Sequence, residues 1–235
     1  MSYSASGGEP AVDVVLGSAF ADAFELSKKN LRPALIMIVL GAIIGFAFAL
    51  TSSGREDKLQ GALFGCDLAI IVVSYYAIAA AVRTINPSYR MTFGQFFGVL
   101  GYSLLAGLLT MLASCVFVIP AFWVGPKVLL MPYTYAINNG APETLPKTWN
   151  MTTGYYWPTL GFVILFGLSV GVLAMVAFGI AGALIYTVPI LAVVAIPIAI
   201  AVLVWLLHVQ ALAYVRWTAS LLQRVEPSVP VPVIS

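Results

Sequence analysis

Three ionisable residues lie inside long apolar stretches of this sequence and are its first candidates for chemistry: Asp67, Lys127 and His208. A titratable side chain at membrane depth is costly, so its presence there often marks an ion, proton or ligand site. Asp67 and Lys127 each stand about seven residues into an apolar run entered from the same side, which predicts a depth of about 10 Å for both. We expect them to meet as an intramembrane polar pair. The pair would either fix helix packing or form an ion or proton site.

His208 is the only histidine in the chain. A metal or haem site usually needs further ligands, so this residue could supply only one axial ligand to a pigment or haem. The alternative is a hydrogen-bonded packing residue. The sequence contains no Ser-His-Asp arrangement, paired carboxylates, phosphate-binding loop or zinc-protease motif. We therefore predict no enzyme, no cofactor and no metal, with His208 as the one candidate for cofactor binding.

Two prolines interrupt an apolar run that ends at Ile137, namely Pro126 and Pro132. Proline lacks the backbone N–H that an α-helix uses, and its ring collides with the preceding turn, so both positions predict a helix break. A polar segment at residues 138–140 follows, and then an aromatic-rich stretch that ends at Trp157. This broken helix is the most specific feature of the chain.

The composition is that of a protein embedded in lipid. Of the 235 residues, 61% are hydrophobic and 9% are charged, whereas about a quarter of the residues in a soluble domain are charged. A water-soluble fold of this size cannot bury so much apolar surface. The net charge of +2 is too small and too dispersed to indicate nucleic-acid binding. The predicted fold class is all-α, a polytopic membrane helix bundle.

Apolar runs of hydrocarbon length predict about six transmembrane helices, since about 20 residues are needed to cross a bilayer. The first four runs are Leu31–Leu50, Gly61–Val82, Gly98–Ile119 and Ala121–Ile137. Pro158–Leu207 has no charged residue and suits two helices that turn near Tyr186–Pro189, the second continuing to about Leu222. Similar stretches before Pro33 and Pro158 suggest three helical hairpins, each introduced by an interfacial helix.

The ends of the chain differ from its apolar centre. The predicted domains are a lead and interfacial amphipathic helix at 1–30, a six-helix transmembrane domain at 31–222 and an extended Pro/Val tail at 223–235. In the amphipathic helix, Ala19 lies on the apolar face, while Glu25 and Lys29 stand one turn apart on the wet face. The lead does not have the pattern of a secretory signal.

Positive charges predict the orientation, because cytoplasmic loops of membrane proteins carry an excess of Lys and Arg. They gather in alternate connections: Lys28, Lys29 and Arg32, then Arg83 and Arg90, then Lys147, then Arg216 and Arg224. This alternation predicts six crossings with both termini in the cytoplasm.

The stretch IPAFWVGPKVLLMPYTYAINNGAPETLPKTWNMTTGYYWPTLGFVIL resembles the core of the six-helix membrane domain of some glycerophosphoryl diester phosphodiesterases and of its stand-alone bacterial relatives of uncertain function. The shared pattern is a proline that opens a short helix with a basic residue, here Pro120 and Lys127, then Pro132, a polar turn and the amphipathic segment Leu145–Trp157. AFELSKKNLRPAL also looks like the opening of that family. The resemblance implies a six-helix bundle in a bacterial inner (plasma) membrane. It does not imply phosphodiesterase chemistry, which belongs to a separate soluble domain.

These features favour a non-catalytic integral membrane protein, an accessory, scaffold or assembly subunit of a larger membrane complex. Its expected partners are the lipid bilayer and other membrane protein subunits, without nucleic acid. The alternative is a transporter or lipid-handling protein that uses the broken fourth helix. An intramembrane enzyme is a third interpretation, which the scarcity of titratable groups disfavours.

Overall fold

Eight helices build the described part of the chain, and no strand occurs in that part. The computed structural model describes residues 12–51, 55–116, 118–141, 143–187 and 192–225. The helices are α1 (Val12–Thr51), α2 (Arg55–Ile85), α3 (Phe93–Val116), α4 (Val118–Leu129), α5 (Met131–Ile137), α6 (Thr144–Gly154), α7 (Tyr156–Thr187) and α8 (Ala192–Val225). The predicted all-α class is confirmed for these ranges.

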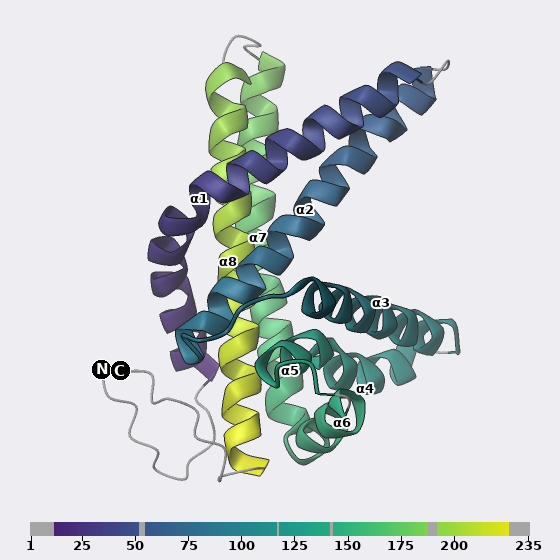
Figure 1. Ribbon diagram of the computed structural model, residues 1–235, viewed down its shortest axis with the longest axis vertical. Coiled ribbons are helices and arrows are strands. Elements are labelled where there is room, and N and C mark those ends of the chain that lie inside the picture. Colours follow the sequence, from purple (N-terminus) through teal and green to yellow (C-terminus); the bar gives the residue numbers. More distant parts are fainter. Residues whose placement is uncertain (1–11, 52–54, 117, 142, 188–191, 226–235) are drawn as a thin grey trace.

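Helices that follow one another in the chain pair as hairpins: α1 with α2, α3 with α4, and α7 with α8 (Figure 1). The hairpins point in different directions. In Figure 1, α7 and α8 run along the long axis, α1 and α2 run obliquely to them, and α3 and α4 run across them. Helices α5 and α6 both contact α8 and thereby join the α3–α4 hairpin to the rest of the fold.

The core lies around α8, which contacts α1, α2, α5, α6 and α7. Trp217 is fully buried, stacks on Phe162 of α7 with ring centroids 4.7 Å apart, and donates its indole N–H to Thr159. One turn away on α8, Tyr214 stacks on Tyr133 of α5 at 5.0 Å. Aromatic pairs of this kind stabilise a fold by about 0.5–1.5 kcal/mol each beyond the area they bury. Rings from three helices therefore fix how α5 and α7 pack on α8.

Three helices of the described ranges are long and apolar enough to cross a bilayer: Phe93–Cys115 in α3, Tyr156–Ala177 in α7 and Ile198–Val225 in α8. In the most apolar parts of α3 and α7, 11% of the residues are buried inside the protein, whereas in α8 the share is 50%. Large apolar side chains such as Leu108 and Leu168 are therefore exposed. Continuous apolar faces of this kind require cover by lipid or protein.

Helix α1 unites two elements that the sequence predicts as separate, the interfacial helix and the first span. Pro33 lies inside α1, and the helix changes direction along its length (Figure 1). A proline in mid-helix removes one backbone hydrogen bond and commonly bends the helix. The predicted apolar face is used, because Val15, Ala19 and Ala23 are buried in the core that α8 shares. On the exposed face, Glu25 pairs with Lys28 at 2.9 Å rather than with Lys29.

Other boundaries also differ from the prediction. Helix α2 begins within the expected polar loop, at Arg55. Helix α3 begins at Phe93 rather than Gly98 because Thr92 and Gln95 exchange hydrogen bonds between side chain and backbone N–H, at 3.1 and 3.3 Å, which is a capping box. Helix α8 continues to Val225, so the first residues of the predicted tail are helical. The predicted lead at 1–10 and the rest of the tail lie outside the described residues.

Candidate functional site

The break in the fourth apolar segment lies at Leu130, between α4 and α5. Pro132 stands in the first turn of α5, where a helix does not need the missing N–H. The carbonyl of Leu130 accepts hydrogen bonds from the backbone N–H and the hydroxyl of Thr134, at 2.9 and 3.0 Å. Non-helical backbone is tolerated at membrane depth where it is satisfied inside the protein in this way.

Pro126 does not break a helix, because α4 continues through it from Val118 to Leu129. The proline has no N–H to donate to the carbonyl of Phe122, one turn earlier. The hydroxyl of Tyr156, at the start of α7, donates to that carbonyl at 2.8 Å. A side chain of a neighbouring helix thus replaces the missing amide, which explains why only one of the two predicted breaks occurs.

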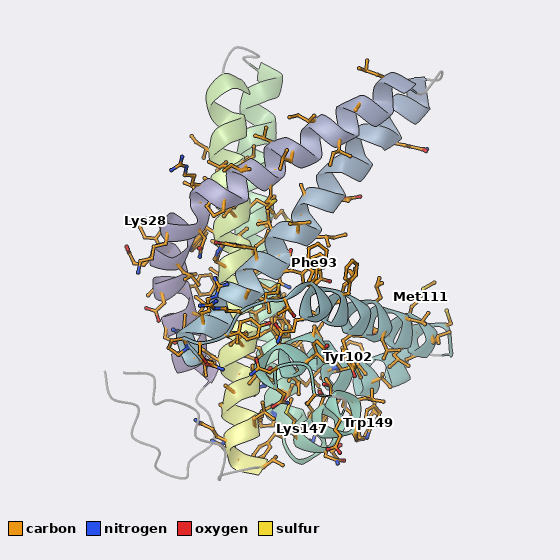
Figure 2. The ribbon with its side chains drawn as sticks, viewed as in Figure 1. Lys28, Phe93, Tyr102, Met111, Lys147 and Trp149 are labelled. Atoms are coloured by element: carbon orange, nitrogen blue, oxygen red, sulfur yellow. The ribbon has the colours of Figure 1, made fainter. Side chains whose placement is uncertain are left out.

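Lys127 is buried between two tryptophan rings. Its ammonium lies 4.4 Å from the ring centroids of both Trp123 and Trp149, and 2% of the residue is exposed. Trp123 precedes Lys127 by one turn of α4, whereas Trp149 comes from α6 (Figure 2). A cation over an aromatic face is stabilised by about 0.5–2 kcal/mol. The rings therefore stabilise the charge and hold α6 against α4. A tryptophan four residues before the lysine was the sequence signal for this contact.

The expected contact between Asp67 and Lys127 is not formed in the described part of the chain, where the ammonium contacts the two tryptophans instead. Asp67 is exposed on α2. Helix α2 packs on α1, α5 and α8, whereas α4 packs on α3, α5, α6 and α7. Equal depth brings two side chains together only if their helices are neighbours, and these two helices are not.

His208 is fully buried in α8, and its Nδ1 lies 2.8 Å from the carbonyl of Val204, one turn earlier. Because a carbonyl can only accept, this distance indicates that Nδ1–H donates, as in a packing residue. The other ring nitrogen has no partner among the described residues. Those residues also include no group of three or more His, Cys, Asp or Glu side chains that could hold a metal ion.

A cavity of about 560 Å³ opens beside the break at Leu130. Leu129 and Pro132, on the two sides of the break, form part of its wall. The polar lining consists of Ser103, Thr110 and Ser114 from α3, Tyr133 from α5 and Gln210 from α8. This volume is within the range of small-molecule sites, which is about 300–1,000 Å³. Neither Asp67 nor Lys127 lines the cavity.

Arg216 joins α1 to α8, a contact that was not predicted from the sequence. Its guanidinium donates to the Ser18 hydroxyl at 2.9 Å and to the Asp22 carboxylate at 2.5 Å. Arg216 is buried, whereas the Asp22 side chain is 58% exposed. Ser18 and Asp22 stand one turn apart and therefore share one face of a helix. This spacing could have predicted a basic residue as the partner of that face.

The connection between α2 and α3 is held by Arg83, whose Nε donates to the carbonyl of Tyr89 at 3.1 Å. Burial raises the pKa of the Tyr89 phenol above its usual value of 10.0, and the positive charge of Arg83 partly opposes this. The phenol is therefore protonated at neutral pH.

No family model, curated protein or solved structure matched this chain. The cavity offers hydroxyl and amide groups, and the buried cation Lys127 lies outside its lining. These groups can hold a ligand by hydrogen bonds and by apolar contact.

Proposed function

We propose that this chain is a non-catalytic integral membrane protein that serves as an accessory, scaffold or assembly subunit of a larger membrane complex. The observation that supports this role is the exposure of α3 and α7, since only 11% of the residues in their most apolar parts are buried. Helices associate in membranes by close packing of such faces. The outer faces of α3 and α7 are therefore the surfaces on which helices of other subunits would pack.

The proposed topology has six crossings of a bacterial inner membrane, with both termini in the cytoplasm. Helix α1, with 40 residues, and α2, with 31, are long enough to contribute the first two crossings. Helices α4 and α5 together would supply the fourth. The alternation of Lys and Arg supports this orientation. The resemblance to the six-helix membrane domain of certain phosphodiesterases supports the same count and location.

In-cell photo-cross-linking tests the subunit role. A photoreactive amino acid replaces Leu108 on α3 or Leu168 on α7, both of which are exposed. The expected result is a discrete adduct with a second membrane protein, which co-purifies in mild detergent. The control position is Gln223, near the end of α8. Adducts with lipid alone at Leu108 and Leu168, together with a stable monomer in mild detergent, would contradict the role.

The cavity at the broken helix favours a second candidate function, a transporter or lipid-handling protein. An amide and several hydroxyls beside a helix break can hold a polar group that enters from the bilayer. The test compares transfer of labelled lipids between vesicles with and without the full chain. Transfer no faster than in protein-free vesicles would remove this candidate.

A further inference from the structure

Gln210 places an amide where a bilayer supplies no hydrogen bonds. It lies near the middle of the 28-residue apolar stretch Ile198–Val225, and its side chain is exposed at the cavity. Among the described residues, the Tyr133 hydroxyl lines the same cavity and is the electrostatic neighbour of this amide. A glutamine amide has two donor hydrogens and an acceptor oxygen, so a single hydroxyl leaves most of this capacity unused. Because an unpaired amide in hydrocarbon is costly, a ligand with polar groups would stabilise it there.

The opposite wall, on α3, offers acceptors. The hydroxyl of Thr110 donates to the carbonyl of Ala106, and that of Ser114 donates to the carbonyl of Thr110, each at 2.8 Å. A hydroxyl has a single hydrogen, so both oxygens are left to accept from a ligand. The cavity thus has acceptors on one wall and an amide that both donates and accepts on the other.

The lining contains no ionisable residue other than the phenol of Tyr133. A phosphate headgroup would therefore bring an unpaired charge to membrane depth, which is unfavourable. A quinone carries only acceptors and would leave the α3 hydroxyl oxygens unpaired. A lipid alcohol carries an O–H donor, and its ester carbonyls can accept from the glutamine amide.

We propose that the cavity between α3, α5 and α8 binds a neutral lipid alcohol of the diacylglycerol type. Its hydroxyl donates to the oxygen of Thr110 or Ser114, and an ester carbonyl accepts from Gln210. Its acyl chains leave past Gly107 and Met111, which are exposed on α3; Met111 is labelled in Figure 2. This inference rests on the lipid-handling candidate and is independent of the subunit role.

Photolabelling of the purified full chain tests the site. The chain is placed in phosphatidylcholine nanodiscs with a diacylglycerol that carries a diazirine in one acyl chain. A Cβ added at Gly107 meets no atom within 4 Å, so Gly107→Leu fills the cavity without a clash at its Cβ. We expect labelling to fall about tenfold, as for a ligand that loses its apolar contacts and a hydrogen bond. Gly101→Leu is the matched control, because Gly101 is equally open but does not line the cavity.

The chemistry of the headgroup is tested by Gln210→Leu and by competition. Gln210→Leu should lower labelling about fivefold, the effect of one lost hydrogen bond. Unlabelled diacylglycerol should compete, whereas phosphatidic acid and a quinone should not. Equal labelling of Gly107→Leu and Gly101→Leu would overturn the site, and equal competition by phosphatidic acid would overturn the headgroup assignment.

Folding and transport are measured separately from binding. Thermal unfolding is recorded for each variant, and the double variant Thr110→Val with Ser114→Ala, which removes the two α3 hydroxyls proposed as acceptors, replaces any variant that fails to fold. It should lower labelling, and unchanged labelling would count against the site. Specific labelling without accelerated lipid transfer between vesicles would overturn the lipid-handling function but not the binding site.

Discussion

At the scale of single residues, the carbonyl of Phe122 shows how this fold tolerates a proline inside a helix. Pro126 removes the helical donor, and the Tyr156 hydroxyl supplies another at 2.8 Å. This hydrogen bond is part-buried, and a carbonyl kept from water without a partner costs about 1–3 kcal/mol. The continuity of α4 therefore depends on a residue of α7.

Tyr156→Phe should lower the free energy of unfolding by about 1–3 kcal/mol, because it leaves the Phe122 carbonyl unpaired. Pro126→Ala restores a backbone N–H at the right position. In that background, Tyr156→Phe should cost less than about 0.5 kcal/mol, since the carbonyl already has a donor. Unfolding of the four proteins in mixed micelles gives the comparison. An equal cost in both backgrounds would show that the hydroxyl does not replace the amide.

Lys127 and Trp149 should be energetically coupled. Their coupling, from the double-mutant cycle of Lys127→Met and Trp149→Leu, is expected to be about 0.5–2 kcal/mol, the range of a desolvated cation over a ring. The matched cycle pairs Lys127→Met with Asp67→Asn. It should give a coupling within about 0.5 kcal/mol of zero, as for side chains that do not touch. A larger coupling to Asp67 than to Trp149 would restore the ion pair expected from the sequence.

Gly98 allows a close approach between α3 and α5. A Cβ at this position would collide with the Tyr135 side chain, and the Tyr135 ring is packed 5.0 Å from that of Tyr102. Gly98→Ala should therefore destabilise the fold by about 1–3 kcal/mol. Gly101→Ala, on the same helix in open space, should be neutral or stabilising by up to about 1 kcal/mol. Equal effects in a thermal unfolding assay would contradict the close contact.

At the scale of elements, the first half of α1 is a docked part of the fold and not an isolated helix at the membrane surface. Its small apolar residues pack in the core shared with α8, and Arg216 binds Ser18 and Asp22. A buried guanidinium with two acceptors specifies one register between these helices.

Arg216→Met should release the first half of α1. Amide hydrogen exchange across residues 12–30 is expected to quicken by about tenfold, the equivalent of one charged hydrogen bond. Lys28→Met is the control, because the Lys28–Glu25 pair is exposed on both sides and such pairs contribute little. Exchange that changes equally in both variants would count against the docking.

The positions of the helices could be predicted from the sequence more accurately than the contacts between helices. Apolar period and length located the helices, and Pro132 correctly indicated the break beside Leu130. Pro126 and the pairing of Asp67 with Lys127 were wrong for a common reason: each depended on which helices touch. Depth and propensity are local properties, whereas the Tyr156 hydroxyl and the Trp149 ring come from other elements of the fold. The cavity also needs three helices at once, so no single stretch of sequence predicts it.

At the scale of the whole molecule, the proposed orientation makes a direct prediction. A single cysteine at Ser88, in the exposed connection between α2 and α3, should react with a membrane-impermeant maleimide only after the cytoplasmic side is opened. A cysteine at Ser53, between α1 and α2, should react in intact cells. Both would be read by gel shift in a chain without its native cysteines. The reverse pattern would invert the topology, and reaction of both from one side would reduce the number of crossings.

The contact between Arg216 and α1 links residues that are 198 and 194 positions apart in the chain. During synthesis, each of the three hairpins can form as soon as its second helix emerges, but the first half of α1 gains its contact with Arg216 only when α8 arrives. A ribosome that stalls before α8 would thus release a protein with inserted helices and an incomplete centre.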